Sequence, residues 1–202
     1  KSKNNKKYIK KTKRKNKEKK ILIDIGCFNA KTNSLTYKLL NRKRDKWFGY
    51  MIEPNPYMKD DIKKNLKGLD YKYYNLAISN KNATLPFYLG KYGFFNRREK
   101  VQKNKCMRSS LVSNKDFVKQ HLTDNKIDVK AITLKKFIKD NKIKKIDLLK
   151  IDTEGYEFNI LKGLIKNFSK IKLIYFEHHY DDMIIKNYNF SDINNLLIKF
   201  GF

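Results

Sequence analysis

Short apolar runs that end in acidic residues or glycine recur along the chain and predict the strands of a parallel sheet. The clearest run is 146–151, where apolar side chains dominate as they do in strands that are buried on both faces. Gly155 permits a tight exit from this run, and Tyr156, Ile160 and Leu161 then recur at helical spacing. The stretch therefore predicts a central strand followed by a helix that packs back onto the sheet.

The rest of the chain alternates between strand-like and helix-like patterns. Strands are expected at 21–26, 47–53, 71–79, 83–90, 127–134 and 172–180, and helices at 35–40, 57–69, 134–141 and 192–200. Pro86 removes a ladder donor and predicts an edge strand, while one of the polar residues 32–34 is expected to cap the first helix. This order favours an α/β fold with a mostly parallel central sheet flanked by helices.

Acidic side chains stand at the carboxyl ends of four of these strands. They are Asp24, Glu53, Asp152 and Glu177. Ligands bind at this edge of open α/β sheets, so the four side chains predict a binding site. Glu154 and Glu157 follow closely, but they also have a structural explanation, because a negative charge near a helix N-terminus is favourable by about 0.3–1 kcal/mol.

The sequence of the turn after the first strand indicates which kind of ligand can bind there. Gly26 is followed by Cys27, Phe28, Asn29 and Ala30, without the GxGxxG pattern that lets backbone approach a pyrophosphate. NAD and FAD are therefore disfavoured, whereas a nucleoside cofactor without phosphates fits. The acid that ends the second strand can accept both hydroxyls of a ribose bound over this turn.

The composition gives the chain a strong positive charge, and the function of this charge stays open. The 202 residues suit one domain, and the formal net charge of +28 is typical of proteins that bind phosphates. Only 6 of the 48 basic residues are Arg, the side chain that makes bidentate phosphate and base contacts. The abundance of Lys and Asn is equally consistent with AT-rich codons.

Two segments concentrate the basic residues. Residues 1–20 contain 12 Lys or Arg and one acid, Glu18, and predict a flexible tail ahead of a domain at 21–202. Residues 91–108 mix aromatic and basic side chains, which suits either nucleic-acid stacking or a loop whose aromatic rings dock on the core. Both segments therefore leave nucleic acid open as a partner.

Cysteine usage and hydropathy bear on the compartment. Cys27 and Cys106 form no disulfide or zinc pattern, and no apolar run approaches the roughly 18 residues of a membrane span. The basic N-terminal stretch is not followed by the apolar region of a signal peptide. We expect a soluble, intracellular, cytoplasmic protein.

Five motifs occur in one order with fitting spacings. They are DIG at 24–26, IEPNP at 52–56, NLAIS at 75–79, LLKIDTEGYEFNILKG at 148–163 and FEHH at 176–179. Together they resemble the FkbM-type S-adenosylmethionine-dependent methyltransferases over about 21–202. The resemblance implies a Rossmann-like class I methyltransferase fold with strand order 3-2-1-4-5-7-6, whose last two strands would follow Phe202. The family's AN-x-G after the first glycine is replaced here by the residues at 27–30.

The resemblance also implies a cofactor, S-adenosyl-L-methionine, and a set of residues that bind it. Asp24 and Gly26 would line its methionine part, Glu53 would hold the ribose hydroxyls, and 75–77 would lie near the adenine. The expected cofactor-binding residues are Asp24, Gly26, Glu53, Asn55, Asn75, Ala77 and Asp152. The family mostly methylates hydroxyl groups of sugars or small metabolites, so a small-molecule or glycan acceptor is expected.

Transfer to a hydroxyl requires alignment and a base. We expect His178 to be that base, with Asp152 and Glu154 beside it, because an imidazole titrates near neutral pH. Strand alternation turns His178 and His179 to opposite faces, so at most one leans toward the pocket. A less favoured alternative is a divalent metal bound by some of the residues Asp152, Glu154, Glu177 and His178.

Two other functions stay open at this stage. One is a non-catalytic nucleic-acid-binding protein with a methyltransferase-like fold, against which stands the coincidence of acids at four strand ends. The other is an RNA methyltransferase, although the chain shows no obvious Lys-Asp-Lys-Glu arrangement of the kind used by ribose 2′-O-methyltransferases.

Overall fold

The computed structural model describes residues 18–32, 34–90, 109–112, 122–180 and 186–202, with the side chains of 122–125 left out. Most of the predicted basic tail, the whole basic and aromatic segment 91–108 and Cys106 lie outside these residues. No helix in the described ranges combines the length and the apolar character that a membrane span requires.

The main sheet has five strands, and each neighbouring pair runs parallel. The strands are β1 (Lys20–Ile25), β2 (Trp47–Ile52), β3 (Tyr71–Tyr74), β7 (Leu148–Ile151) and β8 (Ile174–Phe176), in the order β3-β2-β1-β7-β8. The predicted parallel α/β architecture is thus confirmed, and β7 lies inside the sheet between β1 and β8. The order also agrees with the first five positions that the resemblance implied.

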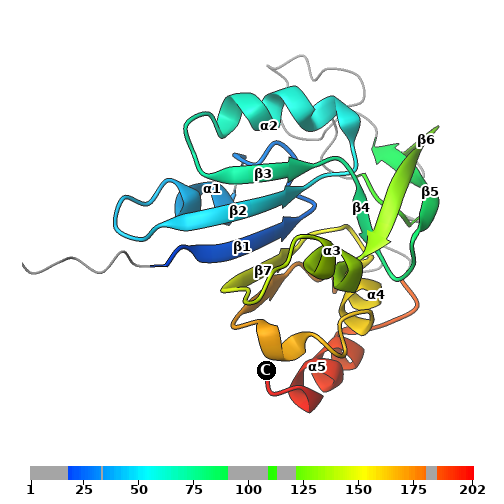
Figure 1. Cartoon of the computed structure of the whole chain (residues 1–202). Coiled ribbons are helices and arrows are strands. Elements are labelled where there is room, and N and C mark those ends of the chain that lie inside the picture. Colours follow the sequence, from blue (N-terminus) through cyan, green and yellow to red (C-terminus); the bar gives the residue numbers. More distant parts are fainter. Residues whose placement is uncertain (1–17, 33, 91–108, 113–121, 181–185) are drawn as a thin grey trace, which may run out of the picture.

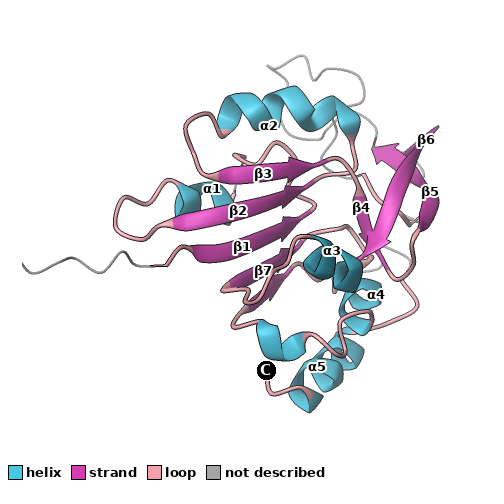
Figure 2. Ribbon diagram, viewed as in Figure 1, coloured by secondary structure: helices cyan, strands magenta, loops and turns pink. Residues whose placement is uncertain are grey.

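A second, three-stranded sheet stands beyond the ends of β1, β2 and β3 (Figure 2). It consists of β4 (Ala77–Ser79), β5 (Ala83–Gly90) and β6 (Leu122–Thr133), in the order β4-β6-β5. β4 pairs with β6 in parallel and β5 pairs with β6 antiparallel. β5, which contains Pro86, is an edge strand as predicted.

The single strand predicted at 71–79 is wrong, because the chain breaks at Asn75 and its two halves join different sheets. The side-chain amide of Asn75 donates to the backbone carbonyls of Glu53 and Pro54, each at 2.9 Å. These bonds tie the junction between β3 and β4 to the end of β2. The strand predicted at 172–180 is also shorter in the structure, where β8 ends at Phe176.

Helices follow the strands much as the pattern predicts. They are α1 (Leu35–Leu40), α2 (Lys59–Asn65), α3 (Leu134–Asp140), α4 (Glu157–Lys162) and α5 (Phe190–Lys199), with short 3-10 turns η1 (Pro56–Met58) and η3 (Phe168–Lys170). Ser34 caps α1 by accepting a hydrogen bond from the backbone N–H of Tyr37 at 3.1 Å. The helix predicted at 57–69 begins as the turn η1 and continues as α2.

The core has two layers because successive strand residues point to opposite faces of the main sheet. Leu22 and Leu148 pack with side chains of α1 and α2, whereas Ile23 and Leu149 pack with side chains of α3, α4 and α5. All four side chains are at most 2% exposed. Helices therefore cover both faces (Figure 1), which explains why β1 and β7 read as nearly continuous apolar runs.

The ends of β1 and β7 approach each other closely at Gly26. Its φ of +78° is in the left-handed region, and a Cβ added there would stand 1.9 Å from the backbone oxygen of Asp152. Glycine is therefore needed at this position for two separate reasons, its backbone conformation and its lack of a side chain.

Gly68 offers a matched control for separating these two reasons. Its φ is +80°, but a Cβ there would meet nothing within 4 Å. We expect Gly68→Ala to cost about 1 kcal/mol of unfolding free energy through backbone strain alone. Gly26→Ala should cost about 2–4 kcal/mol, because overpacking adds to the strain. Urea denaturation measures both, and equal losses would contradict the close approach of the two strands.

Candidate active site

A cavity of about 320 Å³ lies at the carboxyl ends of the main-sheet strands. On the main-sheet side its lining is acidic, with Glu53, Asp152, Glu154 and Glu177. On the side of the small sheet its lining is apolar, with Ala77, Ile78, Phe87 and the nearby Leu111. The cavity thus has a charged side and an apolar side, each supplied by a different sheet.

The structure brings some of the predicted cofactor residues to this cavity and keeps others behind its surface. Gly26, Glu53, Ala77 and Asp152 are among the lining residues, and so is the predicted catalytic residue Glu154. Three further predicted residues are not among the described lining residues: Asp24, Asn55 and Asn75. Their contacts instead hold lining residues in place.

Glu53 is held at the tip of β2 by backbone donors on two sides. Its Oε2 accepts the N–H of Phe28 at 2.9 Å and its Oε1 accepts the N–H of Asn55 at 2.9 Å. The side chain is nearly buried, and this burial raises the pKa of Glu53 to about 7 despite the two hydrogen bonds, which lower it. The first turn is therefore shaped around this carboxylate, and Phe28 adopts a left-handed φ of +47° to reach it.

Lys150 connects Asp24 with Asp152 and was not identified from the sequence, where it looks like a light interruption of an apolar strand. Its Nζ lies 3.1 Å from Asp24 Oδ1 and 3.0 Å from Asp152 Oδ2. Asp24 also accepts a hydrogen bond from the hydroxyl of Thr36. Burial alone lowers the pKa of Lys150, but the charges of Asp24 and then Asp152 outweigh it and raise the pKa above its ordinary value. The ammonium group therefore stays charged.

Asp152 reaches the cavity from the end of β7. Its side chain is 34% exposed. Burial of the carboxyl and a contact with Glu177 raise the pKa of Asp152 to about 7, against the opposing effect of Lys150. The pKa of Glu177 is shifted the other way, mainly by His179. This edge of the cavity therefore holds two carboxyl groups with very different proton affinities.

His179, and not the predicted His178, contacts acidic side chains that line the cavity. Its Nε2 lies 3.5 Å from Glu154 Oε2 and 3.7 Å from Glu177 Oε2. The carboxylates of Glu154 and then Glu177 raise the pKa of His179 to about 10. Both separations exceed ordinary hydrogen-bond length, so the attraction is mainly electrostatic.

The structure does not bring His178 to this cluster. Its ring packs against the rings of Tyr180, Tyr188 and Phe190, with centroid distances of 4.8, 6.2 and 5.5 Å. Burial lowers the pKa of His178, and His178 is not among the described residues that line the cavity. The two histidines lie in different surroundings as expected, although both follow the end of β8, and His179 is the one that contacts carboxylates lining the cavity. The structure therefore places neither the predicted base nor the histidine of the alternative metal set beside the carboxylates of the cavity.

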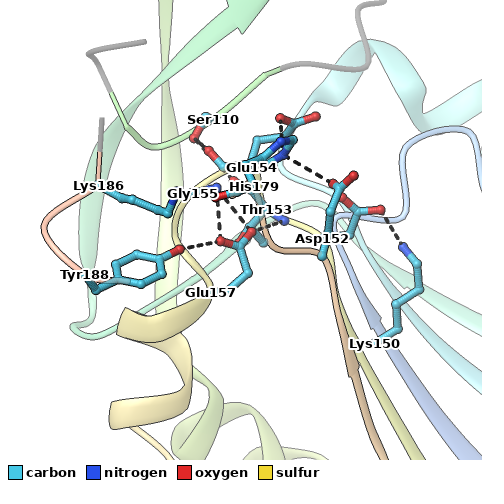
Figure 3. Close-up of polar contacts among 11 residues, drawn as sticks. Ser110, Lys150, Asp152, Thr153, Glu154, Gly155, Glu157, His179, Lys186 and Tyr188 are labelled. Atoms are coloured by element: carbon cyan, nitrogen blue, oxygen red, sulfur yellow. Dashed lines mark hydrogen bonds and ion pairs between the residues drawn. The ribbon is translucent and has the colours of Figure 1, made fainter. Parts of the chain in front are cut away.

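Glu157 fixes the loop that carries Glu154 (Figure 3). It is 1% exposed, and its carboxylate accepts hydrogen bonds from the backbone and hydroxyl of Thr153, from the N–H of Gly155 and from the hydroxyl of Tyr188. It also lies in the first turn of α4, which agrees with the structural explanation expected for it. Glu157 thus supports the site and is not among the described residues that line the cavity.

Comparison with known proteins places this geometry in a family. The family model described as the Methyltransferase FkbM domain matches residues 24–202. No curated protein and no solved structure matches the chain. The matched range begins near the end of β1 and contains the other strands of both sheets and every described residue that lines the cavity. The chain therefore belongs to the FkbM methyltransferase family.

Proposed function

We propose that this protein transfers a methyl group from S-adenosyl-L-methionine to a hydroxyl group of a sugar, glycan or small metabolite. The observation that carries the proposal is the pair of carboxylates that reach one cavity from different strands, Glu53 from β2 and Asp152 from β7. The first suits a ribose and the second suits a reacting hydroxyl. The cofactor, when bound, supplies an electrophilic methyl group on a sulfonium.

The side chains that line the cavity fit this cofactor. Each oxygen of Glu53 already accepts one backbone N–H and keeps a further lone pair that a ribose hydroxyl can use. Ala77, Ile78 and Phe87 supply an apolar surface suited to the faces of an adenine ring. The carboxylates of the main-sheet side favour a cationic, phosphate-free nucleoside and would repel a pyrophosphate.

Asp152 is the group best placed to act as the general base. Its carboxylate is accessible from the cavity, and Lys150 anchors one of its oxygens at 3.0 Å. When the acceptor oxygen bonds to the methyl carbon, the acceptor O–H bond breaks and the proton passes to the carboxylate of Asp152. His178 takes no part in this step, because its ring lies among aromatic side chains.

The mouth of the cavity suits a polyhydroxylated acceptor better than a nucleic acid. Tyr175, with half of its surface exposed, lines the cavity, as does Glu177. An aromatic face beside a hydrogen-bonding carboxylate suits a small polar molecule. The acidic lining disfavours an acceptor that carries phosphates, and the basic segments that suggested nucleic acid lie outside the described residues.

The first prediction tests the ribose role of Glu53 through Glu53→Gln. Two charge-assisted hydrogen bonds would be weakened, so the affinity for S-adenosylmethionine should fall at least about tenfold. Because burial raises the pKa of Glu53 to about 7, wild-type affinity should rise from about pH 6 to about pH 8 as the carboxyl ionises. The variant should show a weaker and flatter profile in calorimetric titrations, and an unchanged affinity would exclude this role.

The same ionisation supplies a control on folding. A carboxyl whose pKa is raised in the native state binds its proton more tightly there than in the unfolded chain. The contribution of Glu53 to the free energy of unfolding should therefore fall as the pH rises from about 4.5 to about 7. Glu53→Gln should remove this contribution while remaining folded, which thermal unfolding across that pH range would show.

The second prediction separates Asp152 from His178 as the base. In assays of methyl transfer to a panel of monosaccharides, glycans and polyols, Asp152→Asn should lower kcat by about 10²–10⁴. His178→Ala should keep kcat within about twofold, because its ring is not at the cavity. A normal kcat in Asp152→Asn, or a loss confined to His178→Ala, would reverse the assignment.

A further inference from the structure

We infer that Glu154, Glu177 and His179 form a binding site for a divalent transition-metal ion at the acidic side of the cavity. One potential ligand atom from each side chain lies within 4.8 Å of the others. The three residues come from two segments, the loop after β7 and the chain that leaves β8, which Figure 3 shows meeting beside Asp152. This set differs from the less favoured metal alternative that the sequence left open, which used His178.

The position of His179 Nε2 is the observation that points to an ion. This nitrogen is buried, and in the described part of the chain it makes no hydrogen bond. It lies 3.5 and 3.7 Å from oxygens of Glu154 and Glu177, beyond the roughly 2.7–3.2 Å of an N–H···O hydrogen bond. Two ligands of one tetrahedral ion, each at about 2.0–2.2 Å from it, stand about 3.4 Å apart. The observed separations are close to that spacing.

Hydrogen bonds hold the backbone of all three ligand residues. Glu154 has a left-handed φ of +56°, and its carbonyl accepts the hydroxyl of Ser110 at 2.9 Å. The N–H of Glu177 donates to the carbonyl of Ile151 at 3.1 Å. The carbonyl of His179 accepts a hydrogen bond from Lys186. A strained backbone conformation that is fixed in this way is typical of functional sites.

The ligand types select the class of ion. One imidazole nitrogen with two carboxylates suits Mn²⁺, Zn²⁺ and related first-row ions, whereas Mg²⁺ and Ca²⁺ prefer oxygen ligands alone. The two carboxylates would also balance the double positive charge of the ion, which would displace the proton from Nε2 of His179 on binding. Three protein ligands leave further coordination positions open for oxygen atoms of a bound molecule.

The location of the site suggests that the ion takes part in methyl transfer, an inference that rests on the proposed function. Glu154 and Glu177 both line the cavity, and Asp152 lies next to Glu177. An ion there would bind the acceptor hydroxyl and lower its pKa, so that the proton passes more easily to Asp152. Two neighbouring hydroxyls can occupy adjacent coordination positions, which favours acceptors that carry a vicinal diol.

Manganese binding tests the site without any activity assay. The full chain, stripped with EDTA and dialysed, is titrated with MnCl₂, and free Mn²⁺ is followed by electron paramagnetic resonance. The wild type should bind one equivalent, and Glu177→Gln and His179→Gln should each weaken binding at least about tenfold. His178→Gln is the matched control and should bind like the wild type. No stoichiometric binding by the wild type, or equal binding by His179→Gln, would overturn the site.

A second measurement separates this inference from the proposed function. Methyl transfer to a diol-containing acceptor should be lost in EDTA and restored by Mn²⁺, whereas the affinity for S-adenosylmethionine should be the same in both. Full transfer in EDTA would reject the metal role and leave the proposed function intact. Stoichiometric Mn²⁺ binding without transfer to any hydroxyl acceptor would support the site and count against the proposed function.

Discussion

The buried ammonium group of Lys150 is the constraint on which the rest of the site depends. Asp24 on β1 and Lys150 on β7 are register partners in adjacent parallel strands, and Asp152 follows at the strand end. A buried charge must be paired, because removing one partner of a buried ion pair costs about 3–5 kcal/mol. The three charges therefore fix how β1 and β7 end, and with them the position of the carboxylate that faces the cavity.

The two sheets line the cavity with side chains of different chemistry. The main sheet brings acids to its carboxyl edge, because parallel strands end side by side there, and Glu157 holds the loop beyond β7 through hydrogen bonds from Thr153, Gly155 and Tyr188. The small sheet contributes apolar side chains, and Ser110, which bridges to Tyr88 of β5, donates its hydroxyl to the same loop. The cavity thus has a charged side and an apolar side, and the apolar side suits a nucleobase.

Much of this arrangement could be predicted from the sequence, because strands buried on both faces read as apolar runs and acids that follow them gather at one edge. Other features depend on contacts that a local pattern does not contain. The break at Asn75 depends on carbonyls at the end of β2, and the charge of Lys150 depends on its register with Asp24. The choice between His178 and His179 depends on the path of the chain after β8 ends at Phe176, which a strand pattern does not contain.

The most direct test of this account is a crystal structure of the chain with S-adenosylhomocysteine, the product that the proposed reaction leaves behind. The account requires the ribose hydroxyls within hydrogen-bond distance of Glu53, the adenine against Ala77 and Ile78, and the sulfur directed toward Asp152. A nucleoside bound away from Glu53, or crystals soaked at saturating ligand with nothing bound in the cavity, would contradict it.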